Sequence, residues 1–201
     1  VVWYPSLQSY LEEKSFESTY SGKKDFQVIF QTWKQNRDFI QKNPRNDAAY
    51  YSMAQGYYTL QAYDESIAAL QKAIDANPTN DSYWVFLGRA YQAKKDYPKV
   101  IDSFIKALEN NPKKKEHYTQ LAWLYYFRTN DQTAKAYDVL KKGLETFPND
   151  KELLWDITRF YAYDKNMEGF QKYAPQYLKL DPTNELVLSV QKDIKEKGKI
   201  Q

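Results

Sequence analysis

The chain has 201 residues, of which 17% are aromatic and 42% hydrophobic, so it can fill a core and wholesale disorder is excluded. Its 29 Lys and Arg face 26 Asp and Glu, and a net charge of +3 is too small to indicate a nucleic-acid-binding protein. Cysteine is absent, which excludes disulfides, thiolate catalysis and cysteine-ligated metals. With only 6 Gly and 8 Pro, and no run near the roughly 18 apolar residues of a membrane span, we expect an all-α chain without such a span.

The chain begins with Val1-Val2 rather than with methionine. We therefore expect that a segment was removed upstream: either a leader or anchor, as in an exported or membrane-tethered bacterial protein, or the rest of a longer chain from which this domain was excised. A chain without cysteine suits both the cytosol and the periplasm, so the composition leaves both compartments open.

Two helices are predicted before the first Asn-Pro pair, over Ser6 to Tyr20 and over Asp25 to Lys42. The second predicted helix carries apolar residues at helical spacing, which indicates one buried side. These residues are Phe26, Ile29, Phe30, Trp33, Phe39 and Ile40. We interpret residues 1–46 as a helix pair at one end of a larger helical array.

Beyond this pair the sequence repeats itself. Five prolines stand in similar surroundings, each 34 or 36 residues after the one before: Pro44, Pro78, Pro112, Pro148 and Pro182. A fixed period in this range is typical of stacked helical repeats. Proline ends a helix because it cannot continue the hydrogen-bond ladder, and it favours extended geometry in the residue before it.

Within each period the same residue types return at offsets of three, four and seven residues, which predicts two amphipathic helices per period. In the first helix, large side chains surround one small residue, and we expect this residue to let the second helix approach closely. Asp64, Asp96 and Asp131 are expected to cap the second helices. The first-helix columns are Tyr50, Trp84, Tyr118 and Leu154; Met53, Leu87, Leu121 and Ile157; Ala54, Gly88, Ala122 and Thr158; and Tyr57, Tyr91, Tyr125 and Tyr161.

A final helix is predicted over Glu185 to Lys197, with one apolar and one charged face. It would shield the last repeat from water. Pro175 falls inside the second helix of the last period, where proline costs about 3 kcal/mol, so we expect a local distortion there.

These columns resemble those of the tetratricopeptide repeat (TPR) family, and residues 81–114 match closely through Trp84, Leu87, Gly88, Tyr91, Phe104, Ala107 and Pro112. The resemblance implies four repeats, the third with two extra residues near Arg128 to Gln132, at residues 47–80, 81–114, 115–150 and 151–184. It also implies a right-handed superhelix of stacked antiparallel helix pairs with about eleven helices. Residues 1–46 would be a divergent repeat or cap, and residues 185–201 a capping helix.

Constellations for catalysis or metal binding are missing from the sequence. His117 is the only histidine, and next to Lys113 to Lys115 it is expected to be a solvated residue near a helix start rather than a base or a ligand. No glycine-rich phosphate motif and no nucleophile elbow occurs. We therefore predict that the protein is not an enzyme and has no catalytic residues, cofactor or metal.

A TPR array has a concave face lined by its first helices, and in the family this face usually binds a peptide or another protein. Here the residues one position beyond the core columns would line it, and aromatic residues and Arg are enriched at binding hot spots. We predict a partner-binding groove on the first helices of residues 47 to 163, formed by Tyr51, Gln55, Tyr58, Arg89, Trp123, Tyr126, Trp155 and Arg159. Phe86 and Phe127 flank this set, either as groove residues or as filler between helices. The partner would be a protein or peptide segment with apolar anchors and a carboxylate facing Arg89 or Arg159.

Three other interpretations concern the partner. Family members that bind chaperone C-terminal tails hold the terminal carboxylates with Lys, Asn and Arg on their first helices, whereas the equivalent places here contain no lysine. The chain could instead be an assembly protein that self-associates, or that joins a membrane-associated complex through its ends or convex face. An RNA-binding helical repeat is disfavoured because no basic stripe lines the groove.

Overall fold

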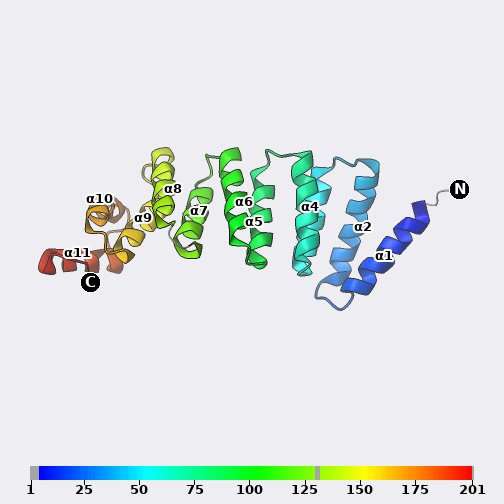
Figure 1. Cartoon of the computed structure of the whole chain (residues 1–201), viewed down its shortest axis with the longest axis horizontal. Coiled ribbons are helices and arrows are strands. Elements are labelled where there is room, and N and C mark those ends of the chain that lie inside the picture. The colour runs from blue at the N-terminus through cyan, green and yellow to red at the C-terminus, as the bar shows by residue number, and fades with distance from the viewer. Residues whose placement is uncertain (1–4, 130–131, 201) are drawn as a thin grey trace. The chain divides into compact units, whose positions relative to one another are not determined.

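The computed structural model describes residues 5–129 and 132–200, and in this part of the chain it contains eleven α-helices and no strand. The prediction of an all-α chain is confirmed. The chain divides into two compact units, Val1–Asn110 with α1 to α6 and Asn111–Gln201 with α7 to α11 (Figure 1). The helices are α1 Pro5–Tyr20, α2 Phe26–Lys42, α3 Asp47–Thr59, α4 Tyr63–Ala76, α5 Asp81–Ala93, α6 Tyr97–Asn110, α7 Lys115–Arg128, α8 Thr133–Thr146, α9 Lys151–Tyr163, α10 Met167–Leu178 and α11 Glu185–Lys197.

The helix boundaries agree closely with those predicted from the sequence, and the last helix has the bounds that were expected. The boundary between the two units lies near residue 110, inside the predicted repeat array. The division into residues 1–46, 47–184 and 185–201 stays a prediction. Two extra residues were expected between the helices of the third repeat, near Arg128 to Gln132. Positions 130 and 131 of this stretch lie outside the described residues, and so does the predicted cap Asp131.

The first helices and α11 begin three residues after the recurring prolines, and the residue two positions after the proline is the cap position. It caps through its side chain in every case except Lys114 before α7. Asn80 accepts a hydrogen bond at 3.1 Å from a backbone N–H in the first turn of α5, and Asp150 accepts two at 3.0 Å in α9. Such caps satisfy backbone donors that have no partner inside the helix. The recurring Pro-x-Asn or Pro-x-Asp pattern therefore ends one helix and starts the next. The caps of this kind are Asn46, Asn80, Asp150 and Asn184.

The second helices begin differently. Asp96 precedes α6 and accepts a long hydrogen bond, 3.4 Å, from the backbone N–H of Lys99, which agrees with its predicted capping role. The prediction for Asp64 is wrong, because α4 begins one residue earlier and its cap position is Ala62. Asp64 forms an ion pair instead with Lys94, the residue that follows α5.

In the turn between the two helices of a pair, the chain reverses direction at one residue whose backbone is in the left-handed region. Gln61, Lys95 and Lys165 have φ values of 62°, 61° and 52°. The next N–H then reaches back to the carbonyl of the recurring tyrosine, in the Schellman geometry that ends a helix. These bonds run from Ala62 to Tyr57 at 2.9 Å, from Asp96 to Tyr91 at 3.0 Å and from Asn166 to Tyr161 at 2.9 Å.

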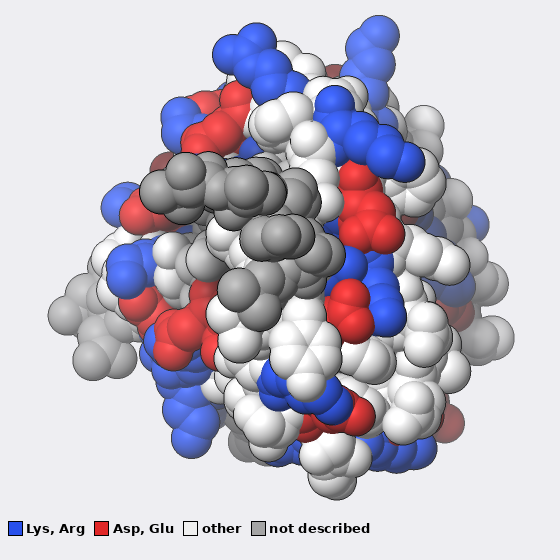
Figure 2. Space-filling model, turned by 90° about the vertical axis from the view of Figure 1, so that its right-hand side faces the viewer, with Lys and Arg blue, Asp and Glu red and all other residues white. Residues whose placement is uncertain are grey.

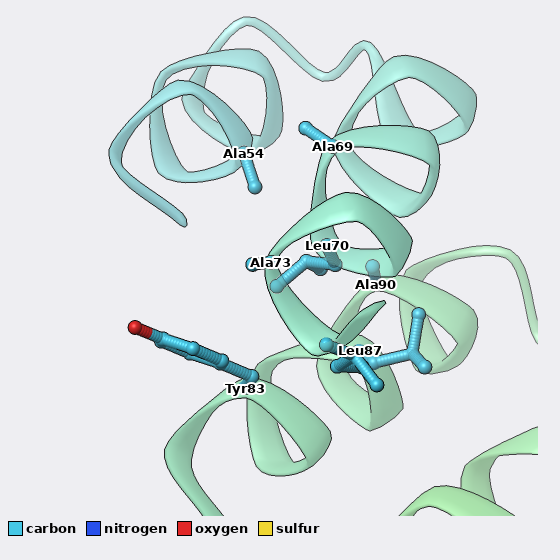
Figure 3. Packing of buried hydrophobic residues seen from close by; sticks show 8 residues of the cluster. Ala54, Ala69, Leu70, Ala73, Tyr83, Leu87 and Ala90 are labelled. Atoms are coloured by element: carbon cyan, nitrogen blue, oxygen red, sulfur yellow. The ribbon is translucent and has the colours of Figure 1, made fainter. Parts of the chain in front are cut away.

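In the first unit the core lies between the first and second helices of consecutive pairs. Figure 3 shows how small and large side chains alternate there, and Ala54, Leu70 and Ala73 are fully buried. Ser66 of α4 donates a hydrogen bond of 2.8 Å to the carbonyl of Ala54 in α3, so the two helices meet at the predicted small residue. Interiors packed in this way tolerate little change in side-chain volume.

The N-terminal helix pair is part of the first unit. Phe16 of α1 packs on Trp33 of α2, with 4.7 Å between their ring centroids. The indole N–H of Trp33 donates a 2.8 Å hydrogen bond to the Tyr57 hydroxyl, which ties α2 to α3. Phe39 is an exception to the predicted buried side of α2, because 56% of it is exposed.

In the second unit, the buried residues at the repeat positions vary more in side-chain size than in the first unit. Phe170 and Ala174, which reverse the usual order of small and large residues, are both fully buried. Helix α10 continues through Pro175. The prediction that His117 is solvated is wrong, because this residue in the first turn of α7 is buried and only 1% exposed.

Gly88 is expected to be intolerant of a side chain. A Cβ at this position would lie 2.9 Å from Cε2 of Phe104 in α6, as the predicted close approach requires. Gly88→Leu should therefore lower the free energy of unfolding by about 1 to 3 kcal/mol or more. The measurement is urea denaturation followed by circular dichroism. Gly22→Leu is the control, because nothing lies within 4 Å of a Cβ there, and equal losses in both variants would contradict the proposed repeat register.

The Asn80 cap offers a second stability test. Asn80→Ala removes the acceptor for the first turn of α5 and should cost about 1 kcal/mol. Asn149→Ala changes an exposed asparagine in a comparable loop and should have almost no effect. Equal thermal unfolding of wild type and Asn80→Ala would show that the cap does not stabilise the helix.

Candidate functional site

On the first unit, the predicted groove residues Tyr51 and Tyr58 belong to a ring cluster shared by α3 and α5. The Phe86 ring lies 5.6 Å from that of Tyr51 and 5.2 Å from that of Tyr58, so it bridges the two helices. All three side chains are half-buried. Each ring thus combines a packing role with an exposed edge. We call Tyr51 and Tyr58 of α3, Tyr83 and Phe86 of α5, and the adjoining Tyr63 of α4 the α3–α5 ring cluster.

The base of this cluster is anchored by Asp47. The Tyr83 hydroxyl donates a 3.0 Å hydrogen bond to Asp47, and the Asn77 amide donates a second one of 2.9 Å. Burial, together with this carboxylate, raises the pKa of Tyr83 to about 12. Because Tyr83 is held in place, the Tyr51 ring that lies 4.8 Å from it has a rigid support.

Gln55 and Arg89 are the exposed polar members of the predicted set in the first unit. Arg89 follows Phe86 by one helical turn, so the guanidinium and the ring share one side of α5. No ion pair or hydrogen bond engages the Arg89 side chain within the described residues.

On the second unit, Trp123 and Tyr126 of α7 form a ring cluster with Phe127 and with Phe160 of α9. The Tyr126 ring stacks on Phe160 at 3.9 Å, and the Trp123 ring lies 5.2 Å from Phe127. Phe127 is 43% exposed, which favours a surface role over that of filler. Trp123 is half-buried, with the Arg128 guanidinium 5.1 Å from its ring centre.

Tyr126 also has a structural role that its position in the sequence did not indicate. Its hydroxyl donates a 2.5 Å hydrogen bond to Asp164, and the Tyr137 hydroxyl donates another of 2.5 Å to the second oxygen of the same carboxylate. Burial, followed by the bond to Asp164, raises the pKa of both tyrosines. Asp164 thereby connects α7 and α8 to the end of α9.

Trp155 and Arg159 lie on α9 and are both half-buried. The guanidinium of Arg159 lies 5.8 Å from the Trp155 ring centre and forms a 2.7 Å ion pair with Asp156. The Asp156 side chain is buried, with 8% of it exposed. Arg159 is therefore already paired, unlike Arg89.

A pocket that the sequence did not indicate lies between α2 and α3. It has a volume of about 230 Å³ and is lined by Val28, Ile29, Met53 and Gly56, with Gln55 at its edge. A Cβ at Gly56 would come within 3.0 Å of Ile29, so glycine lets the two helices meet at this point.

Other kinds of site find little support in the described residues. No group of three or more His, Asp or Glu side chains in residues 5–129 and 132–200 is arranged to hold a metal ion. None of the described helices combines the length and apolarity that a membrane crossing requires. Figure 2 shows basic and acidic side chains intermixed on the displayed face, which is not the pattern of a nucleic-acid-binding surface.

The antiparallel helix pairs, their recurring small residues and their capped turns define a helical-repeat protein. The sequence model of the tetratricopeptide repeat family matches residues 37–81 and 51–114. No curated protein matches the chain by sequence. Residues 37–114 thus match this family, and the resemblance to tetratricopeptide repeat proteins inferred from the sequence is confirmed.

Solved structures agree on the fold. The crystal structure of YrrB, described as a TPR protein with an unusual peptide-binding site, has a TM-score of 0.61 and 16% identity, covering 93% of this chain and 98% of its own. A crystal structure of MamA has a TM-score of 0.61 and 17% identity, covering 75% of this chain and 86% of its own. MamA from Desulfovibrio magneticus RS-1, residues 41 to the end, has a TM-score of 0.57 and 12% identity, covering 90% and 96%.

Asp156 should make stability depend on pH. Burial, opposed by the nearby Arg159, raises the pKa of Asp156 from 3.8 to about 6. The folded protein then holds this proton more tightly than the unfolded chain, so stability falls as the pH rises through the interval between these two values. The asparagine side chain of Asp156→Asn cannot ionise, so this variant should lack the decrease in stability that Asp156 causes.

The measurement is urea denaturation of wild type and Asp156→Asn at several pH values between pH ~3.5 and ~7. The free energy of unfolding of wild type minus that of the variant should decrease by about 1 to 3 kcal/mol over this range. A difference between wild type and variant that does not change with pH would reflect only the loss of the Arg159 partner, and it would contradict the raised pKa of Asp156.

Proposed function

We propose that the chain is a non-enzymatic interaction scaffold that binds a peptide or protein segment on the exposed side of its first helices. The observation that carries this proposal is the pair of partly exposed ring clusters, one on α3 and α5 and one on α7 and α9. Rings held by packing on one edge lose little entropy when a partner covers the other edge. The match of residues 37–114 to the tetratricopeptide repeat family supports this function.

The predicted residues contribute in different ways. Tyr51, Tyr58 and Trp123 offer ring edges, and Trp155 offers a ring that lies against Tyr177 at 5.3 Å. Tyr126 adds stacking area while its hydroxyl is held by Asp164. Gln55 is an exposed amide that can bond to the main chain of an extended segment. The groove over residues 47 to 163 would draw on both units, and its continuity stays a prediction.

The fold of YrrB supports a peptide as the partner, since that protein is described as having a peptide-binding site. The bound segment of the partner would be extended or helical, and its apolar side chains would pack among the rings. The chain's own assembly is the competing function, and it predicts a mass that increases with concentration in the absence of any peptide.

The test uses peptides selected by the full chain from a random-peptide library, with affinities measured by fluorescence anisotropy. Trp123→Ala and Tyr58→Ala should each weaken binding by about 2 kcal/mol if the ring is a hot spot. Leu188→Ala is the matched control, because it removes a 42% exposed apolar side chain from α11.

Circular dichroism and thermal unfolding must show that all three variants keep the wild-type fold. If the two ring variants remain folded and bind every selected peptide at wild-type affinity, the first helices are not the binding surface. Light scattering over a range of concentrations then tests self-association directly.

A further inference from the structure

The exposed side of α3 and α5 is almost free of charge. Apart from Asp47 in its first turn, α3 contains no charged residue. Helix α5 has Asp81 in its first turn and otherwise only Arg89. Asp47 is engaged with Asn77 and Tyr83, so it does not neutralise the guanidinium. The α3–α5 surface therefore presents a single cation next to rings and amides.

Arg89 differs in this respect from Arg159, which occupies the equivalent position in the second unit. Arg159 is paired with the buried Asp156, whereas α5 offers Arg89 no carboxylate within four residues on either side. A cation that the protein leaves without a counter-charge beside apolar area complements a partner carrying one acid next to an apolar side chain.

The position of Arg89 along α5 favours an acid within a segment over one at its end. Val85 and Phe86 lie one turn before Arg89, and Gln92 lies almost one turn after it, so the surface continues on both sides of the guanidinium. Gln55 and Gln92 are exposed amides that can form hydrogen bonds with main-chain groups of a peptide that extends on both sides of Arg89. The ring cluster provides the adjacent apolar contact.

We propose that the α3–α5 surface binds a peptide segment containing an internal aspartate or glutamate next to an aromatic or aliphatic residue. The acid pairs with Arg89, and the neighbouring side chain packs on Phe86 between Tyr51 and Tyr58. This inference rests on the proposed function and names the partner chemistry of that surface. The second unit contributes no equivalent acid contact, because Asp156 occupies Arg159.

The experiment selects random dodecapeptides in parallel against the full chain and against full-length Arg89→Gln. Peptides selected by wild type should be enriched in Asp or Glu beside Phe, Tyr, Trp or Leu, and those selected by the variant should not. For a selected peptide, Arg89→Gln should weaken binding by about tenfold or more. Lys72→Gln, which removes the same charge from an exposed position on α4, should change it by about twofold or less.

Peptide variants identify the acid. Replacing the internal Glu or Asp by its amide should reproduce the loss seen with Arg89→Gln, and the two changes together should cost no more than either alone. Amidation of the peptide C-terminus should leave the affinity unchanged. A loss on amidation, or wild-type affinity in Arg89→Gln, would overturn the inference.

The two proposals can fail separately. If Tyr58→Ala weakens binding while Arg89→Gln does not, the ring surface is correct and the acid contact is wrong. If Tyr58→Ala, Trp123→Ala and Arg89→Gln all bind at wild-type affinity, or if no peptide is selected, both proposals are wrong. Peptides that lose affinity equally in Arg89→Gln and Lys72→Gln would show only long-range attraction, which also overturns the proposed contact.

Discussion

The structure depends on the close approach of the two helices within each repeat. Ala54 and Ala122 are fully buried at this contact, and Gly88 leaves no room for a side chain. When the small residue brings the backbones together, the large residues one turn away are forced into the space between consecutive pairs. One small position per 34 or 36 residues therefore sets the register of all the other columns.

The same contact determines which side chains remain available to a partner. Residues one position beyond a core column point away from the second helix, because successive positions on a helix differ by about 100°. They are still close to the next first helix, so their rings pack on one edge. Tyr126 shows the result, with its ring stacked on Phe160 and its hydroxyl bonded to Asp164. Surface and core are thus continuous on the first helices.

Charge distinguishes the two units more clearly than the rings do. Asp156 neutralises Arg159 from within the same helix, whereas the α3–α5 surface holds Arg89 without a counter-ion. The carboxylate of Asp156 is retained in a buried position because the guanidinium lies beside it, as burial of an unpaired charge would be costly. Equivalent positions in a repeat thus differ in role: Arg159 is paired within its helix, whereas we propose recognition for Arg89.

The amino-acid sequence by itself determined the helices, their pairing and the positions that face the core. Periodic apolar columns and prolines act locally, through helix geometry and lost hydrogen bonds, so they can be recognised without a structure. The candidate surface residues also followed from this geometry, although their partners did not. Tertiary structure alone decided that His117 and Asp156 are buried, that Phe39 is exposed and that a pocket opens between α2 and α3. These outcomes depend on the neighbours that other helices supply, and helical periodicity along one chain segment carries no information about them.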